Sequence, residues 1–349
     1  MNDIKAYAAQ SAAAELAPFA IQRRELRADD VALEILYCGV CHTDVHLVDN
    51  DWGVSKYPMV PGHEIVGRVS AVGSAVTKHR VGDLVGVGYM GDACRSCSAC
   101  HSGLEQFCAQ MVPTFNGTDL HDKSNTLGGY AERIVVSDRF VVSVPDGLDP
   151  AAAAPLLCAG ITSYSPLRRF GVQPGMRVGV LGMGGLGHIG VKFAKALGAE
   201  VTIFTRSQAK VEEAQSQGAD HVIVSSDRAQ MRQASERFDL LLNTIPVQHD
   251  VNPYLFCLKY DGTMVMVGVL EPLVPPVHAA LLTMRRRTLV GSSVGGMAET
   301  QEMLDFCAKH DIVCDVELIG IQDINAAYER MKRGAVKYRF VVDMATLKA

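Results

Sequence analysis

The sequence predicts a two-domain protein of mixed class, in which a β-rich part precedes a doubly wound α/β part with a parallel sheet. The chain has 349 residues, which is long for a single hydrophobic core. Residues 1 to about 150 form short alternating segments broken by Gly and Pro, with little helical periodicity. From about Ala151, strands alternate with helices of about ten to fifteen residues, which is the pattern of a parallel sheet.

The expected strands of the β-rich part are short runs of alternating residues that lie between turn residues. Pro145-Asp-Gly147 closes the last of these runs, just before the pattern changes. The predicted strands are Val31–Tyr37, Glu64–Val72, Leu84–Val87, Tyr130–Val136 and Val141–Val144.

In the α/β part, Arg177–Leu181 is the first buried strand, and the helix predicted over Gly187–Leu197 ends at Gly198. A second helix is expected from Gln208 to about Ser216. The further strands are Val201–Phe204, His221–Val224, Leu240–Leu242, Thr263–Val267 and Leu289–Ser292.

A tail follows from about Ser293, and its residues alone do not decide which domain it joins. Helical and alternating apolar patterns succeed one another in it. The predicted elements are two helices, Ala298–Lys309 and Ile324–Arg333, and two strands, Val316–Ile319 and Arg339–Asp343.

The composition is that of an ordinary globular protein, with 48% hydrophobic and 20% charged residues and a net charge of −5. No basic block stands out, so we expect no nucleic-acid partner. The apolar runs are short and broken by glycines, so we expect no membrane partner. The first residues carry no basic segment followed by an apolar one, and we therefore expect a cytoplasmic protein.

Cysteines are frequent, and their spacing favours metal ligands over disulfide bonds. Four of them form the cluster Cys94-x2-Cys97-x2-Cys100-x7-Cys108. Four thiolates this close in sequence can surround one zinc ion and leave no open position, as in structural zinc sites. We expect the cysteines outside metal patterns to be small apolar core residues: Cys38, Cys257, Cys307 and Cys314.

A second set combines the thiolates of Cys41 and Cys158 with the imidazole of His63. Three such ligands leave a tetrahedral zinc ion one open position, as in catalytic zinc sites. Glu64 follows His63 directly, and it can approach the metal or orient its ligands. The alternative is a buried carboxylate paired with an arginine, and the sequence leaves both interpretations open.

Thr43 and His46 follow the first of these ligands closely. If the Thr43 hydroxyl contacts a substrate oxygen, its proton needs a route to water, and histidine is the side chain that exchanges protons near neutral pH. We expect His46 to be that outlet, although a lone histidine is more often structural. Asp44 is expected to support the surroundings of a zinc ligand.

A glycine-rich turn follows the predicted strand Arg177–Leu181 and opens the next helix. In this context the pattern G-x-G-x-x-G indicates a dinucleotide site, because the glycines allow a tight turn and let a pyrophosphate approach the helix N-terminus. An open zinc position together with a dinucleotide indicates hydride transfer at a polarised carbonyl. The residues of the turn are Gly182, Met183, Gly184, Gly185, Leu186 and Gly187.

The end of the second strand of this part bears on the choice of cofactor. Dinucleotide folds that prefer NAD carry an acidic residue there, which binds the ribose hydroxyls. Here Val201–Phe204 runs into a segment without any acid, and Glu200 lies at the opposite end of the strand. The segment offers hydroxyl, guanidinium and ammonium groups, which can bind a 2′-phosphate and therefore favour NADP. The alternative is a solvated turn whose charges have no role in binding. The groups belong to Thr205, Arg206, Ser207 and Lys210.

With these residues in place, the chain resembles the zinc-dependent medium-chain alcohol dehydrogenases, nearly from end to end. It is most similar to the cinnamyl alcohol dehydrogenase-like branch, which includes broad-range bacterial aldehyde reductases. The motifs that carry the resemblance, besides the cysteine cluster and the glycine turn, are Cys41-His-Thr-Asp44, Tyr57-Pro-Met-Val-Pro-Gly-His-Glu64, Thr126-Leu-Gly-Gly-Tyr130, Leu157-Cys-Ala-Gly-Ile-Thr162 and Lys337-Tyr-Arg-Phe-Val-Val-Asp343.

The resemblance implies a GroES-like catalytic domain over residues 1–150, with a zinc lobe at 89–110, completed by about 293–349. A Rossmann NADP-binding domain would span 151–292. It also implies two zinc ions per chain, with Glu64 as an alternate ligand of the open site, and a homodimer. The implied cofactor path is lined by Thr43, Thr162, Thr244, Gly268, Ser292, Ser293 and Val294.

The same resemblance places three aromatic residues at the substrate: Trp52, Tyr89 and Phe115. An ordinary surface-loop position is the alternative for Trp52. We therefore expect a reversible reduction of aromatic and medium aliphatic aldehydes to primary alcohols with NADP(H). The rival interpretations are an NAD-dependent zinc polyol or formaldehyde-type dehydrogenase and a non-catalytic NADP-sensing protein.

Overall fold

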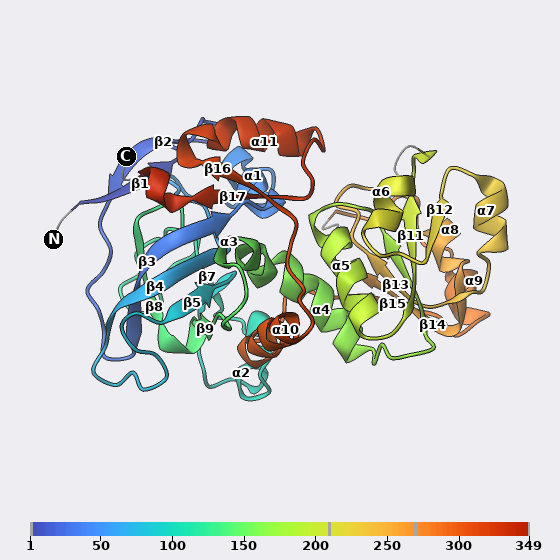
Figure 1. Cartoon of the computed structure of the whole chain (residues 1–349), viewed down its shortest axis with the longest axis horizontal. Helices are drawn as coiled ribbons and strands as arrows, with labels where there is room; N and C mark the ends of the chain where they lie inside the picture. The colour runs from blue at the N-terminus through green and yellow to red at the C-terminus, as the bar shows by residue number, and fades with distance from the viewer. Residues whose placement is uncertain (1–2, 209–210, 269–270, 348–349) are drawn as a thin grey trace. The chain divides into compact units, whose positions relative to one another are not determined.

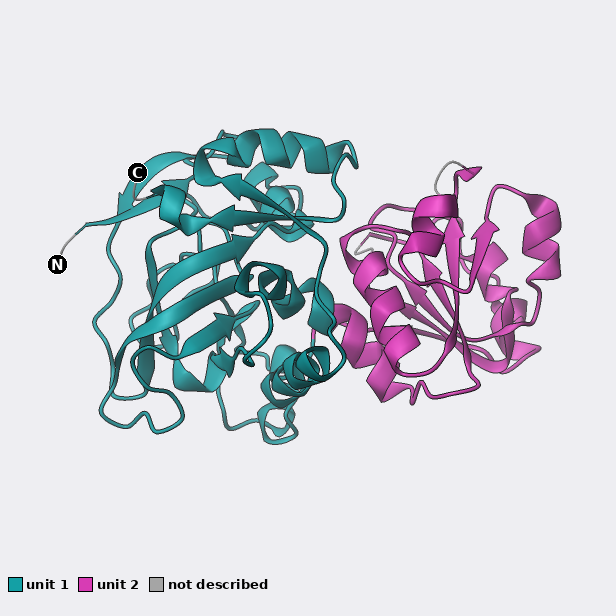
Figure 2. Cartoon of the chain, viewed as in Figure 1, with its two compact units in different colours: residues 1–161, 295–349 teal, residues 162–294 magenta. Residues whose placement is uncertain are grey.

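Figure 1 shows the computed structural model, which describes residues 3–208, 211–268 and 271–347. The chain divides into two compact units, the first formed by residues 1–161 with 295–349 and the second by residues 162–294 (Figure 2). The first unit also contains residues 151–161, which were expected in the second domain. The reason is that α3 (Pro150–Ala153) and the 3-10 helix η3 (Ala154–Leu157) pack against β3 (Asp30–Gly39).

The main sheet of the first unit has the strand order β16-β17-β3-β4-β5-β9, and β8 also pairs with β3. β17 runs antiparallel to β3, with Val342 opposite Cys38 (Figure 1). The tail therefore joins the first unit and lies beside the strand that leads to the first predicted zinc ligand. The strands around β3 are β4 (Ile65–Val72), β5 (Leu84–Val87), β8 (Arg133–Ser137), β9 (Val142–Ser143), β16 (Val316–Gly320) and β17 (Arg339–Asp343).

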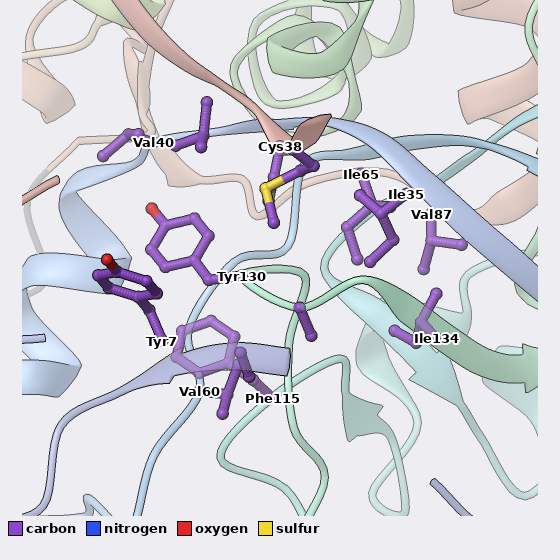
Figure 3. Close-up of a cluster of buried hydrophobic side chains, with 14 of the residues drawn as sticks. Tyr7, Ile35, Cys38, Val40, Val60, Ile65, Val87, Phe115, Tyr130 and Ile134 are labelled. Carbon is purple, nitrogen blue, oxygen red and sulfur yellow. The ribbon is translucent and has the colours of Figure 1, made fainter. Parts of the chain in front are cut away.

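Two small sheets and several helices complete the first unit. The small sheets pair β1 (Ile4–Ala8) with β2 (Ala17–Ile21) and β6 (Met90–Asp92) with β7 (Val112–Pro113). Side chains from several of these elements fill one core, part of which Figure 3 shows. The helices are α1 (His42–Asp49), α2 (Ser98–His101), α10 (Met297–Lys309) and α11 (Ile324–Lys332).

The second unit contains a parallel sheet of order β12-β11-β10-β13-β14-β15. The order runs outwards from β10 in two directions, so the sheet has a switch point between β10 and β13, where such folds bind ligands. The predicted doubly wound sheet is confirmed. Its strands are β10 (Arg177–Leu181), β11 (Glu200–Thr205), β12 (His221–Val224), β13 (Phe238–Asn243), β14 (Leu258–Met266) and β15 (Thr288–Gly291).

Helices connect these strands, and α5 (Gly185–Ala196) packs on β10 and β11. α4 (Ala159–Arg169) was not predicted, because Gly160 and Pro166 hide its helical pattern. It forms all the same because most of its residues are buried by tertiary packing. The other helices are α6 (Val211–Ser216), α7 (Arg228–Gln233), α8 (Asn252–Leu255) and α9 (Ala279–Thr283). Among the described residues, no helix has the length and apolar character to cross a membrane.

Candidate active site

The first predicted zinc ligand lies at the start of α1, a helix that was not among the predicted elements. Cys41 is the N-cap residue of this helix, and its backbone N–H donates to Asp44 Oδ2 over 2.9 Å. The Cys41 side chain in turn accepts the backbone N–H of Asp44, which closes a reciprocal cap. Cysteine is an unusual capping residue, so this helix start gave no ordinary sequence signal.

The same carboxylate holds the second ligand. Asp44 Oδ1 accepts the backbone N–H of Gly62 at 3.1 Å and lies 3.0 Å from His63 Nδ1. Because a carboxylate only accepts, Nδ1 carries a proton and Nε2 is the ring nitrogen left to bind a metal. His63 Nε2 is buried and has no hydrogen-bond partner among the described residues. This orphaned nitrogen is what a metal-binding histidine requires.

Cys158 brings the third ligand to this point. The Sγ atoms of Cys158 and Cys41 lie 3.9 Å apart. The donor atoms of Cys41, His63, Glu64 and Cys158 all lie within 4.8 Å of one another, and all four residues are buried. Two thiolates and an imidazole at this spacing fit a zinc ion with one open position.

The electrostatics of this site favour a cation. The hydrogen bond from Cys158, followed by the neighbouring His63, holds the pKa of Cys41 well below its ordinary value despite burial. Burial would lower the pKa of His63, but the charge of Asp44 and the hydrogen bond to it raise it well above its usual range. A negative thiolate and a site that attracts positive charge are therefore present together.

The surroundings of Glu64 fit both interpretations that the sequence left open, a carboxylate near the metal and a buried carboxylate paired with an arginine. Its Oε1 accepts from Arg339 Nη2 on β17, in a pair that is buried on both sides. Its Oε2 is buried beside the ligand atoms and has no hydrogen-bond partner in the described part of the chain. Burial raises the pKa of Glu64 to about 7, although Arg339 opposes this shift. The carboxylate is thus paired with an arginine and also lies within reach of the metal position.

Two of the three predicted substrate residues surround the His63 ring. Tyr89 meets it edge-on, with ring centroids 5.8 Å apart, and Phe115 stacks on it at 5.7 Å. Phe115 is only 1% exposed and belongs to the core. His63 occupies one face of its ring, and its expected role at the substrate stays a prediction. Tyr89 is half-buried, and its expected role at the substrate also stays a prediction.

Thr43 and His46 lie three residues apart on α1, which places them on one face of the helix. His46 Nδ1 lies 2.7 Å from Asp51 Oδ2 on the half-exposed surface of the first unit. The indole of Trp52 covers the His46 ring, with ring centroids 5.2 Å apart. Sequence reasoning missed Asp51, although its position just past the helix end was visible.

The four-cysteine cluster is a compact lobe. Cys100 Sγ lies 3.6 Å from Cys97 Sγ and 4.0 Å from Cys94 Sγ, and Cys108 completes the group. The Gln110 backbone N–H donates to Cys108 Sγ over 3.3 Å. Hydrogen bonds from Ser96 lower the pKa of Cys94 to about 6. Four sulfur atoms in this arrangement fit a closed zinc site.

The glycine turn lies at the switch point of the parallel sheet. Gly182 follows the last residue of β10 and has a φ of 93°. A Cβ on Gly187 would overlap the Gly182 carbonyl oxygen. Thr244 packs against both glycines, and its hydroxyl donates to Leu181 O over 2.7 Å. A Cβ on Gly184 would meet nothing within 4 Å, so backbone and open space adjoin there, as a pyrophosphate requires. Met183, Gly185 and Leu186 complete this turn and the start of α5.

Several further residues expected along the cofactor path belong to the second unit. Gly268 lies against the Thr244 carbonyl, where a Cβ would be 2.7 Å from its oxygen. The Ser292 N–H donates to Met266 O over 3.0 Å just past β15, and Ser293 and Val294 follow it. Thr162 lies buried in α4, and the hydroxyl of the next residue donates to Leu186 O over 3.1 Å.

The end of β11 turns outward without an acidic side chain. Arg206 is exposed and makes no ion pair with any described residue, and its carbonyl accepts from Ser226 Oγ at 3.2 Å. Thr205 is buried, and Ser207 is exposed. Lys210 lies outside the described residues. Glu200, at the other end of β11, pairs with Arg177 and His221, so it is engaged elsewhere.

Arg339 is the contact that sequence reasoning missed most clearly. It lies 275 positions from Glu64, so no local pattern joins the two residues. A signal existed nonetheless, because an arginine beside the buried run Phe340–Val342 needs a buried anionic partner.

A β-rich unit with two thiolate sites, joined to a parallel sheet with a dinucleotide turn, defines a zinc-dependent dehydrogenase. Residues 27–146 match the family model of the alcohol dehydrogenase GroES-like domain. Residues 185–309 match the model of the zinc-binding dehydrogenases. The chain therefore belongs to the zinc-dependent medium-chain alcohol dehydrogenases, and its two units are a GroES-like and a Rossmann unit.

Within this family the chain is similar to aldehyde reductases and cinnamyl alcohol dehydrogenases. It is 51% identical over 347 residues to aldehyde reductase YahK of Escherichia coli (strain K12), covering 99% of each chain. It is 49% identical to NADP-dependent alcohol dehydrogenase C 1 of Mycolicibacterium smegmatis, covering 100% of each. A cinnamyl alcohol dehydrogenase structure from Sorghum bicolor has a TM-score of 0.96 at 43% identity, covering 99% of this chain and 98% of that one.

Proposed function

We propose that this protein is an NADP(H)-dependent zinc alcohol dehydrogenase that interconverts aldehydes and primary alcohols, and that it works in the cytoplasm as a homodimer with two zinc ions per chain. One observation carries the reaction class. The donor atoms of Cys41, His63 and Cys158 gather in one buried group around an orphaned ligand nitrogen, and the Glu64 carboxylate lies beside them. A relative that matches the whole chain is named an aldehyde reductase.

The residues of the first unit have distinct roles in this proposal. Cys41, His63 and Cys158 hold the zinc ion, and Asp44 fixes the histidine with its Nε2 toward the metal position. When bound, zinc supplies a Lewis acid for a carbonyl oxygen, and the dinucleotide supplies the hydride. The intact ligand set speaks against a protein that only senses the dinucleotide.

The proton follows a separate path along α1. Thr43 lies next to the ligand segment and orients the hydroxyl or carbonyl oxygen of the substrate. His46 lies one helical turn further on and is 36% exposed, so it can exchange a proton with water. Asp51 accepts from His46 Nδ1, which leaves Nε2 as the nitrogen that takes up the proton.

Two aromatic side chains, Trp52 and Tyr89, form the apolar surface that favours particular substrates in this proposal. Trp52 is 38% exposed and covers His46, while Tyr89 packs on the edge of His63. One ring thus lies beside the proposed proton outlet and the other beside a proposed zinc ligand, and together they favour aromatic and medium aliphatic aldehydes.

NADP is the proposed cofactor because the end of β11 lacks the carboxylate that would repel a 2′-phosphate. Thr205, Arg206 and Ser207 offer donors there, and the Arg206 guanidinium can bind a phosphate through two hydrogen bonds. A relative of full-length similarity is named NADP-dependent. Ser226, which bonds the Arg206 carbonyl, steadies this segment.

The test compares the two cofactors with benzaldehyde as substrate. We expect a wild-type kcat/KM that is far higher with NADPH than with NADH. Arg206→Asp replaces a phosphate partner with a repelling charge, so we expect it to lower kcat/KM with NADPH about 100-fold or more and to leave NADH nearly unchanged. Arg333→Asp, at a site 77% exposed on the first unit, is the matched control and leaves the ratio unchanged. A wild type that prefers NADH contradicts the cofactor, and no reduction with either cofactor contradicts the reaction.

A further inference from the structure

Two tyrosines are buried near Asp44, and neither takes part in the proposed chemistry. Tyr130 follows the turn at Gly128–Gly129 and is 0% exposed, and Tyr328 lies on α11 and is 5% exposed. The two phenols are close enough to interact with each other, but neither hydroxyl makes a hydrogen bond of ordinary geometry to a described residue. Buried hydroxyls almost always have partners, so two such groups in one region need an explanation.

Tyr130 is joined to the segment that carries His63. The Tyr130 backbone N–H donates to Pro61 O over 3.0 Å, and the Gly129 N–H donates to Gly62 O over 2.9 Å. A Cβ on Gly62 would lie only 2.9 Å from the Tyr130 ring. Figure 3 shows this ring near Cys38 and Tyr7, with its hydroxyl turned away from Phe115. The hydroxyl therefore lies in the same part of the core as the ligand segment.

Both phenols remain hydrogen-bond donors. Burial raises the pKa of Tyr130 well above its ordinary value, and the neighbouring Tyr328 and Asp44 raise it further. Burial and the charge of Asp44 do the same for the pKa of Tyr328. Two protonated hydroxyls thus lie within electrostatic reach of each other and of one buried carboxylate.

That carboxylate has one acceptor position to spare. Asp44 takes three hydrogen bonds, from the N–H groups of Cys41 and Gly62 and from His63 Nδ1. A carboxylate offers about four acceptor positions. A buried water typically makes about three hydrogen bonds to otherwise unsatisfied groups, and two phenols and a carboxylate supply three.

We propose that Tyr130 and Tyr328 are positioning residues of the open metal site, which together hold one buried water that donates to Asp44 and so fixes the orientation of His63. The water accepts the two phenolic O–H groups and gives one of its own protons to the carboxylate. α11 and the Gly128–Tyr130 segment are thereby connected to a zinc ligand that neither of them touches through its own hydrogen bonds. The inference rests on the zinc ligands of the proposed function.

The test uses Tyr130→Phe, Tyr328→Phe and the double variant in the intact zinc protein. Each change removes only a hydroxyl, so the ring still fills the core. Tyr7→Phe is the matched control, because Tyr7 belongs to the same core cluster. The readouts are the rate of zinc release to a chromogenic chelator and the visible absorption bands of the cobalt-substituted protein. Release from the four-cysteine lobe is an internal reference.

Each single variant is expected to release the open-site metal about three to ten times faster, because it loses one hydrogen bond in the support of His63. The cobalt bands shift in both. The double variant resembles the singles, because either change already dislodges the shared water. The proposal is overturned if the rate of zinc release and the cobalt bands match wild type in both single variants. It is also overturned if the double variant accelerates zinc release by the product of the two single effects. A wild type that binds no metal at the open site overturns this inference and the proposed function together.

Discussion

Asp44 shows how one side chain can join the start of a helix, a loop and a metal ligand. Its two oxygens bond the backbone of Cys41, the backbone of Gly62 and the imidazole of His63. The carboxylate is wholly buried, and its charge is offset by these donors and by the site that it supports. Asp44 therefore fixes the positions of Cys41 and His63, although it is not itself a predicted metal ligand.

His46 is the residue whose role is most directly measurable. We expect His46→Gln to lower kcat and to flatten the pH dependence of the rate, because glutamine can hydrogen-bond but cannot exchange a proton near neutral pH. Zinc content stays full, since His46 is not among the ligand atoms. His310→Gln, at the exposed end of α10, is the control. An unchanged pH profile would show that another group carries the proton.

At the scale of elements, α10 begins where the chain returns to the first unit, and its first residue contacts the cysteine lobe. The Met297 N–H donates to Glu105 Oε2 over 3.1 Å, between residues 192 positions apart. A free N–H at a helix start is usually capped by a neighbour in sequence. Here the cysteine lobe supplies the cap, so this lobe supports the start of a helix as well as its own loop.

Gly296 makes this approach possible, and its replacement tests it. A Cβ at this position would overlap the Gly103 carbonyl oxygen and lie 2.8 Å from Glu105 Oε2. We expect Gly296→Ala to lower the free energy of unfolding by about 1–3 kcal/mol, through overpacking against backbone that cannot move away. The measurement is chemical denaturation. Gly291→Ala is the matched control, since its Cβ would meet nothing within 4 Å. An equal loss of unfolding free energy in the two variants would contradict the close packing of Gly296 against the cysteine lobe.

For the whole molecule, the sequence predicted best what local patterns determine. The alternation of strands and helices identified the parallel sheet, and the glycine turn lies at its switch point. What the sequence did not predict depends on contacts between distant residues. α1 starts at a cysteine cap, α4 contains a proline, and Arg339 meets Glu64 only after the sheet has formed. The first unit includes residues 151–161 for the same reason, because α3 and η3 pack against β3.

The metal content of the whole chain is the broadest test. Two ligand groups, one closed and one open, predict two zinc ions per chain in protein purified without added metal, measured by elemental analysis. Cys97→Ser is expected to impair folding, because a structural zinc contributes its binding energy to the folded state. Cys158→Ser instead abolishes activity in a folded protein. A content near one zinc with full activity would contradict the open site.

The pairing of β17 with β3 also bears on the order in which the protein is made. The segment with Cys41, His63 and Glu64 leaves the ribosome early. Arg339 is made 275 residues after Glu64. Until Arg339 arrives, a nascent chain cannot bury Glu64 beside its partner, and an unpaired buried carboxylate is strongly unfavourable. The candidate metal site around Glu64 is therefore completed late in synthesis, after the cysteine lobe and the nucleotide unit have emerged.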